Sequence, residues 1–204
     1  MNAIYLRALV FTTLALLLSH ANAEQASAGI YRQWHQQILK FDVAESGPKF
    51  VFDETPLLAS GFPAYGNAFV TQGYIYPNGT LDGHNGVATD GSPEFPDQVI
   101  GEWTCRGYFI GNGAETATGP WVITTQHYDF YKHRGYAENK QSTKLNLVSD
   151  GYELVDIDVP GKRAITGGTG RFKRAKGQAV QVLLDSRTNR GQPFGVILDL
   201  GLDR

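Results

Sequence analysis

The sequence of 204 residues has little of three things that would narrow its fold or function: cysteine, net charge and long apolar runs. Cys105 is its one cysteine, so no disulfide can form within the chain, even in an oxidising compartment. The 18 basic and 20 acidic residues nearly cancel, and that balance favours neither nucleic acid nor an anionic membrane as a partner. The fold must therefore be stabilised by its own core or by subunit packing.

The longest apolar run, residues 8–18, indicates export. It follows Arg7 and precedes Ala21-Asn22-Ala23, a small-x-small cleavage site. The run is far shorter than the roughly 20 residues that a membrane-spanning helix needs. We therefore predict a signal peptide over 1–23, cleavage after Ala23, and a secreted or periplasmic protein that does not span the membrane.

The rest of the chain is rich in glycine, with short β-branched and aromatic runs between turn residues. This texture predicts an all-β fold: an N-terminal arm over 24–37, then a single β-barrel domain over 38–204. No internal repeat is evident. Eight strands are expected, at 38–44, 68–76, 98–110, 120–130, 143–149, 162–166, 177–185 and 194–200.

Alternation within two of these runs indicates which side chains share a face. In 99–109, one face carries Val99, Trp103, Cys105 and Phe109, and we expect it to point inward. In 121–129 neither face is plainly polar, as expected for a strand covered on both sides. Closing eight antiparallel strands into a barrel removes their exposed edges and leaves room for packed side chains or one small ligand.

Two long connections, 53–67 and 77–97, interrupt this pattern with prolines and glycines. Loops of that length are usually functional lids or poorly ordered segments. The second contains Asn78-Gly79-Thr80, a glycosylation sequon that matters only in a host that glycosylates exported proteins.

A glycine-rich stretch, "RAITGGTGRF" at 163–172, could bind a phosphate or turn the chain. Phosphate binding needs a helix directly after the loop, and a Walker loop also needs Lys-Ser/Thr after its last glycine. Here Arg171-Phe172 follows, and the next residues return to a β-like run after Gly177. We interpret the stretch as a tight corner between consecutive strands.

The stretch "AITGGTGRFKRAKGQAVQ" resembles the signature turn of the allene oxide cyclase and dirigent barrel families. "GEWTCRGYF" and "GPWVITTQHYDF" are similar to segments of bacterial allene-oxide-cyclase-like proteins, so the resemblance covers most of 36–204. It implies an eight-stranded antiparallel barrel, a lipocalin-like calyx with an apolar pocket, and a homo-oligomer, often a trimer. The residues that match the signature are Gly167, Gly168, Gly170, Phe172, Ala175 and Gly177.

The resemblance also implies candidate site residues. In the cyclases an early-strand glutamate and a nearby asparagine polarise the substrate; "LKFDVAES" places Asp42 at the acid position and Ala44 where the asparagine would be. Cys105 falls at the position of a pocket cysteine. The alternatives are that Asp42 is a solvated strand carboxylate and that Cys105 packs as a small hydrophobe.

Further candidates come from residue type and spacing. His127 and Asp129 lie two apart on one strand face, which suits an acid/base pair, although a hydrogen-bonded histidine at the barrel end is the alternative. The same pair could supply two metal ligands, with His133 in the next turn and His84 in the long loop as further candidates. One histidine and one carboxylate are too few for a zinc site without a third ligand, so we predict no metal. The ligand-binding candidates are the aromatic residues that could line a pocket, together with the cysteine: Trp103, Cys105, Phe109, Trp121 and Tyr128.

These observations lead to one expected function and two alternatives. We expect an exported barrel that binds a small apolar molecule, acyl or phenolic, and steers its cyclisation or coupling without a cofactor, with Asp42, His127 and Asp129 as catalytic candidates. Confinement can accelerate such reactions with little side-chain chemistry. The alternatives are a non-enzymatic carrier of a hydrophobic ligand and a structural exported protein whose lumen is filled.

Overall fold

The computed structural model describes residues 36–111, 119–132, 135, 145–184 and 192–199. The predicted signal peptide, 1–23, lies outside the described residues, as does the predicted arm, 24–37, except for its last two residues. No helix in the described part is long and apolar enough to cross a lipid bilayer.

The described residues form an all-β structure with three single-turn 3-10 helices between the strands. The 3-10 helices are η1 (Gly47–Lys49), η2 (Pro96–Gln98) and η3 (Gly170–Phe172). The strands are β1 (Gln36–Glu45), β2 (Val51–Phe52), β3 (Ala68–Pro77), β4 (Gly101–Phe109), β5 (Pro120–Phe130), β6 (Leu145–Leu154), β7 (Pro160–Gly168), β8 (Lys176–Val182) and β9 (Gln192–Asp199).

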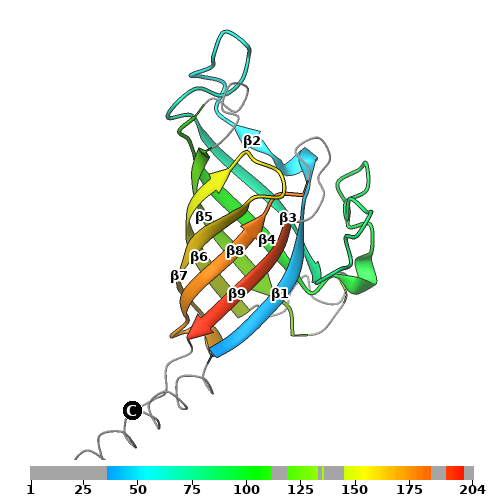
Figure 1. Cartoon of the computed structure of the whole chain (residues 1–204). Coiled ribbons are helices and arrows are strands. Elements are labelled where there is room, and N and C mark those ends of the chain that lie inside the picture. The colour runs from blue at the N-terminus through cyan, green and yellow to red at the C-terminus, as the bar shows by residue number, and fades with distance from the viewer. Residues whose placement is uncertain (1–35, 112–118, 133–134, 136–144, 185–191, 200–204) are drawn as a thin grey trace, which may run out of the picture. The chain divides into compact units, whose positions relative to one another are not determined.

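Strands β3 to β9 pair with their sequence neighbours, and β1 closes the ring because it pairs with both β9 and β3 (Figure 1). The closed ring therefore holds eight strands, β1 and β3–β9, and the prediction of an eight-stranded antiparallel barrel is confirmed. The two-residue strand β2 pairs only with β3, through Val51 and Val70, and extends the sheet at one end of the barrel.

All eight predicted strands are present, and β5 has the predicted bounds. The largest difference is in β6, which continues five residues past the predicted end at 149. Val99, predicted to share the inward face of 99–109, instead precedes β4 and packs in a cluster outside the barrel.

The glycine-rich stretch is a corner between β7 and β8, as predicted. Gly170 has a φ of +56°, in the left-handed region that glycine adopts without strain. A Cβ at Gly168 would lie 2.3 Å from the carbonyl oxygen of Asn146, so a side chain there would collide with β6. The short helix η3 carries Phe172 into the lower lumen, where it is fully buried.

Two buried clusters hold the barrel together, one inside it and one against its outer wall. The lumen cluster contains Phe41, Val43, Ile75, Trp103, Cys105, Tyr128, Phe130, Leu147, Ile165, Phe172, Ala175 and Ala179. The outer cluster forms where the connection after β3 covers β1 and β3, and it contains Ala44, Tyr74, Tyr76, Leu81, Val99 and Tyr131.

The two long connections contain the same backbone hairpin, at 57–63 and at 87–93, although the sequence predicted no internal repeat. In each hairpin the first residue forms a β-bridge with the proline at its end. In each, a glycine at positive φ, Gly61 or Gly91, donates to the carbonyl three residues before it. Each connection thus contains an ordered hairpin with the same backbone hydrogen-bond pattern.

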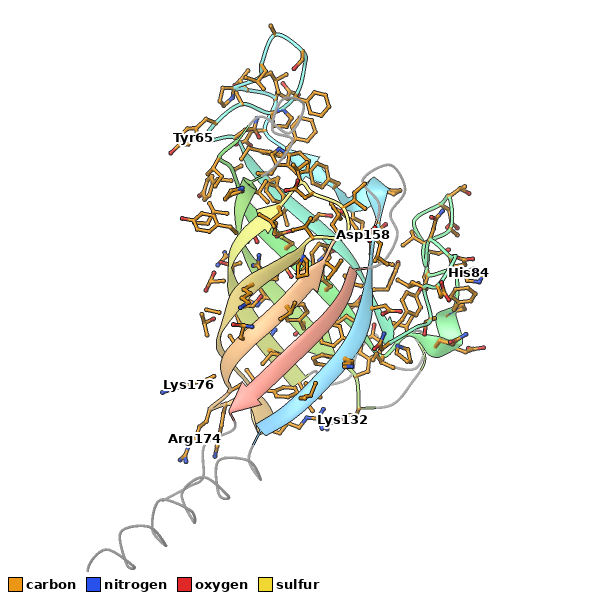
Figure 2. All side chains as sticks on the ribbon, in the orientation of Figure 1. Tyr65, His84, Lys132, Asp158, Arg174 and Lys176 are labelled. Carbon is orange, nitrogen blue, oxygen red and sulfur yellow. The ribbon has the colours of Figure 1, made fainter. Side chains whose placement is uncertain are left out.

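The surroundings of the two hairpins differ. The carbonyl of Gly91, in the second hairpin, accepts hydrogen bonds from the Tyr74 hydroxyl at 2.8 Å and from the Ser46 hydroxyl at 3.2 Å. The first hairpin leaves Leu57 and Phe62 exposed. Tyr65, just beyond it, points away from the barrel at the end where β2 lies (Figure 2).

Candidate functional site

Strand alternation decides which side chains enter the lumen. On β1, Phe41 and Val43 belong to the lumen cluster, and Glu45 continues that face. On β5, Tyr128 and Phe130 belong to it. The lumen has three parts: a filled lower part, an open upper part, and between them a layer of polar side chains. We call this layer the polar belt, and it consists of Arg163, Glu153, Gln126, Ser149 and Thr124.

The lower lumen is filled by aromatic rings. Phe41 packs edge to face against Tyr128 and Phe130, with ring centroids 5.4 Å and 5.3 Å apart. Phe172, carried by η3, lies 5.8 Å from Phe130 and covers this end. Ile75 and other aliphatic side chains fill the remaining space.

Above the rings, Arg163 on β7 crosses the lumen as a fully buried cation. Its Nε donates to the Ser149 hydroxyl at 3.1 Å, and its Nη2 donates to the Thr124 carbonyl at 2.9 Å. Its Nη1 reaches the Glu153 carboxylate at 3.5 Å. These bonds satisfy the buried charge and fix its position.

Glu153, near the end of β6, is the carboxylate on which the polar belt converges. Its Oε1 accepts hydrogen bonds from the Thr124 hydroxyl, from Gln126 Nε2 at 2.8 Å and from the Cys105 thiol at 3.4 Å. Its Oε2 accepts one bond among the described residues, from Gln181 Nε2 at 3.2 Å. Because Oε2 carries fewer bonds and Glu153 lines the space above, this oxygen can still accept from a ligand.

A cavity of about 90 Å³ lies above the belt, in the upper lumen. Four aromatic rings in contact border it: Phe50 on Phe69 at 5.6 Å, Phe69 on Phe109 at 5.0 Å, and Phe109 on Trp121 at 5.5 Å. The remaining side chains that line it are Glu45, Thr71, Trp103, Cys105, Val122, Glu153, Leu154 and Leu183.

A local irregularity of β5 brings Trp121 to this cavity. Alternation from Ile123 would put Trp121 on the outer face, but the pairing with β6 shifts register between Pro120 and Val122. Such a bulge adds one residue to the strand and re-aims its side chain. Trp121 and Val122 therefore both line the cavity.

Glu45, at the end of β1, places a second carboxyl group at the cavity. Burial raises the pKa of Glu45 above its usual range, and the nearby negative charge of Glu153 raises it further. The Thr71 hydroxyl, which donates to Glu45 at 2.6 Å, opposes part of this shift. The cavity thus combines a carboxyl group that holds its proton more tightly than usual with a carboxylate that Arg163 neutralises.

Cys105 and Tyr128 stay protonated in this environment. Burial raises the pKa of the Cys105 thiol well above its ordinary value, and the charge of Glu153 adds to the shift. Burial likewise raises the pKa of the Tyr128 hydroxyl, which donates to Gln126 at 2.6 Å. Since the thiolate is the nucleophilic form of cysteine, this arrangement suits Cys105 as a hydrogen-bond donor.

The structure brings four of the five predicted ligand-binding residues together around the cavity: Trp103, Cys105, Phe109 and Trp121. Tyr128 lies in the lumen below them, hydrogen-bonded to Gln126 of the polar belt. Among the described residues, no cluster of three or more His, Cys, Asp or Glu could hold a metal ion.

The three predicted catalytic residues lie on the outer face of the barrel, not in the lumen. Asp42 accepts hydrogen bonds from the Leu81 amide at 3.1 Å and from Asn78 at 3.3 Å, both in the connection after β3. On β5, His127 and Asp129 alternate with the lumen-facing residues. Their catalytic roles remain predictions, and the lumen offers Glu45 and Glu153 for the same chemistry.

Sequence reasoning missed Glu45, Glu153 and Arg163. A signal existed for Glu45, because Phe41 and Val43 set a period that reaches it two residues later. Glu153 continues the inward series of β6, but the predicted strand ended before it. Nothing in the local pattern distinguishes Arg163 from an exposed strand arginine.

No known family model matches the chain, and neither does any curated protein sequence. Among solved structures it is similar to the pterocarpan synthase dirigent protein PsPTS1, with a TM-score of 0.53 and 15% identity over 80% of this chain and 92% of that one. The pterocarpan synthase dirigent protein GePTS1 matches with a TM-score of 0.51 and 13% identity, over 81% and 89% of the two chains.

A third solved structure, a pyocyanin demethylase, has a TM-score of 0.45 and 13% identity over 79% of this chain and 99% of that one. At these identities the dirigent likeness concerns the fold alone. The chain therefore forms a barrel of the dirigent-like kind.

Proposed function

We propose that the barrel binds a small, ring-bearing apolar molecule at its upper cavity and steers the cyclisation or coupling of that molecule. One observation carries the proposal: two carboxyl groups and five aromatic side chains converge on one open cavity, while the lower lumen is filled. Apolar walls with a few convergent polar groups are the usual composition of a small-molecule site.

The cavity favours a phenol or other hydroxyl-bearing ring over an acyl chain with a carboxylate. The Glu153 carboxylate would repel a carboxylate of the ligand, whereas its Oε2 can accept a hydrogen bond from a hydroxyl group. The volume of about 90 Å³ is well below the roughly 300–1,000 Å³ of common ligand sites, so only the reacting end of the ligand enters the lumen.

The two carboxyl groups supply an acid and a base for an isomerising ring closure. Glu45, whose raised pKa favours the protonated form, donates a proton to a developing oxyanion, such as the carbonyl oxygen of a quinone methide. The Glu153 carboxylate takes the proton released by the hydroxyl group that closes the ring. The substrate is isomerised with no gain or loss of atoms or electrons, so the step needs no cofactor, and exchange with water restores the two acids.

The names of two structural neighbours support this proposal, because both are described as pterocarpan synthases. Export to the periplasm or the medium and assembly into a homo-oligomer remain part of the proposal. A carrier that only stores its ligand is the second candidate, and the same cavity supports it.

Binding can be tested with 4-propylphenol and 4-propylbenzoate. Both carry a propyl-substituted ring, but the first has a neutral hydroxyl group where the second has a carboxylate. Because Trp103 and Trp121 line the cavity, bound ligand should quench tryptophan fluorescence. We expect the phenol to bind at least tenfold more tightly than the benzoate. Equal affinity, or quenching that a Trp121→Ala variant leaves unchanged, would contradict the proposed site.

Steering can be tested with a quinone methide that carries a tethered hydroxyl group and closes spontaneously to a racemic ether. We expect the protein to give one enantiomer in excess, and Glu153→Gln to abolish that excess. Asp42→Asn decides whether the outer-face acid contributes, and Glu54→Gln, an exposed loop substitution, is the matched control. Binding without any enantiomeric excess would indicate the carrier.

A further inference from the structure

The outer wall of the barrel carries a groove of about 610 Å³ across β3 to β6, which the proposed lumen chemistry does not use. Its floor includes the backbone of Gly107 and Gly151, which flank Thr124 on the neighbouring strands. A Cβ at Gly107 would lie 2.2 Å from the carbonyl oxygen of Ile123, so this close approach of strands requires glycine.

The side chains along the groove form two rows across the strands. In the first row, Tyr108 on β4 and Ile123 on β5 pair with each other and line the groove, and Tyr152 on β6 pairs with Ile123 just beyond the lining. Two strand spacings separate the backbones of the two tyrosines by about 9.6 Å. Their exposed fractions are 56% and 53%, unusually high for aromatic side chains on a sheet.

The second row supplies polar groups of both kinds. Arg106 pairs with Thr125, and Thr125 pairs with Asp150, so a guanidinium group and a carboxylate lie on either side of the central strand. Within the described part of the chain, Arg106 makes no side-chain hydrogen bond. Asp150 accepts one bond, from the Thr125 hydroxyl to its Oδ1, and its Oδ2 is available.

We propose that this groove binds a neutral saccharide of at least two rings. The apolar C–H face of a pyranose packs on the tyrosine rings, whose faces carry partial negative charge. Sugar hydroxyl groups accept from Arg106 and donate to Asp150, and the opposite charges of these two residues favour a ligand without net charge. The separation of the tyrosines is comparable with the length of two linked pyranose rings.

A second copy of the chain is the main competing occupant, because Val70 and Ile123 are also exposed on this wall. The centres of protein interfaces are enriched in Tyr and Arg but depleted in Asp and Glu, so Asp150 is the residue that argues against a second copy. Here Asp150 and Arg106 line the groove itself, with hydrogen-bonding capacity to spare. Hydroxyl groups of a saccharide can use that capacity, so the observations favour the saccharide.

The test is isothermal titration of the full protein with two glucose hexamers, one linked β-1,4 and one linked α-1,4. We expect one hexamer to bind, and Tyr108→Ala and Tyr152→Ala each to weaken its Kd at least tenfold. Tyr65→Ala removes a tyrosine that is 77% exposed on a different segment and should leave the Kd unchanged. Glu153→Gln should also leave it unchanged, which separates this groove from the lumen.

Two outcomes would overturn the proposal. The first is that neither hexamer binds, or that binding survives both tyrosine substitutions. The second is that light scattering shows an oligomer whose mass falls in Tyr152→Ala, because the wall would then be an interface between copies of the chain.

Discussion

The same strands enclose both halves of the lumen, but their side chains fill the lower half and leave a cavity in the upper half. Below the polar belt, Phe41, Phe130 and Phe172 pack against one another in a buried cluster. Above it, aromatic rings border a cavity, and Glu45 and Glu153 face that cavity. The filled lower half stabilises the closed barrel, whereas the upper half is less tightly packed and leaves room for a ligand.

The polar belt allows both halves to exist in one lumen. Arg163 and its partners hold β5, β6 and β7 at fixed positions, so the cavity does not need to be filled to keep the barrel open. A fully satisfied buried network rigidifies its surroundings, whereas a partly satisfied one is costly. Disrupting the belt should therefore harm the molecule more than enlarging the cavity.

The largest effect is expected for Arg163→Met. The substitution leaves Glu153 without its cation and removes donors from the Thr124 carbonyl and the Ser149 hydroxyl. Breaking a buried pair by removing one partner costs about 3–5 kcal/mol, so the free energy of unfolding in urea should fall by that amount.

The matched control is the double variant Arg163→Met with Glu153→Gln, which should recover part of the loss because no uncompensated charge remains. If the single variant lost less than about 1 kcal/mol, the belt would not be what holds the two halves apart.

The next effect tests the filled half. Phe41→Ala removes a ring that contacts both Tyr128 and Phe130, and such truncations of buried aromatic residues cost about 3–5 kcal/mol. The loss should appear in urea unfolding, and affinity for 4-propylphenol should stay within twofold once the folded fraction is corrected. A tenfold loss of affinity would show that the two halves are not separate.

The barrel was predictable because buried, inward-facing residues alternate with outward-facing residues along its strands. Trp103, Cys105 and Phe109 recur with a period of two, and their common inward face is confirmed. The closed ring followed from eight strands with mostly short connections, since closure removes exposed edges. These are local signals, and of the predicted inward face only Val99 departs from it, because it precedes β4 and packs in the outer cluster.

The polar interior was not predictable in the same way. A lumen that contains Gln126, Ser149 and Arg163 does not follow the rule that inward residues are apolar, so alternation does not identify its faces. Gly151 and Glu153 read as the end of a strand, although both belong to β6. The position of Trp121 depends on a bulge, which a regular period cannot predict.

A smaller effect on stability is expected in the open half, for Trp121→Ala. The ring borders an existing cavity and is only partly buried, so the substitution should cost about 1 kcal/mol in urea unfolding. Affinity for 4-propylphenol should fall at least tenfold. Phe41→Ala should thus lower stability and spare affinity, whereas Trp121→Ala should lower affinity and largely spare stability. A stability loss as large as that of Phe41→Ala would mean that Trp121 is part of the core.

The smallest effect, and one of opposite sign, is expected for Glu45→Gln. The folded-state pKa of Glu45 is raised, so the folded protein binds this proton more tightly than the unfolded chain. Stability therefore falls as pH rises from the ordinary glutamate pKa through the raised value, and the deficit persists above it. Glutamine cannot ionise but can still accept from Thr71, so the variant should be more stable than the parent at neutral pH and equal to it in acid.

Urea unfolding at pH 4 and pH 8 measures this, with Glu54→Gln as the exposed control. If Glu45→Gln were less stable at pH 8, the carboxylate would be contributing to the packing of the upper half, and the contrast between the halves would be weaker than we propose.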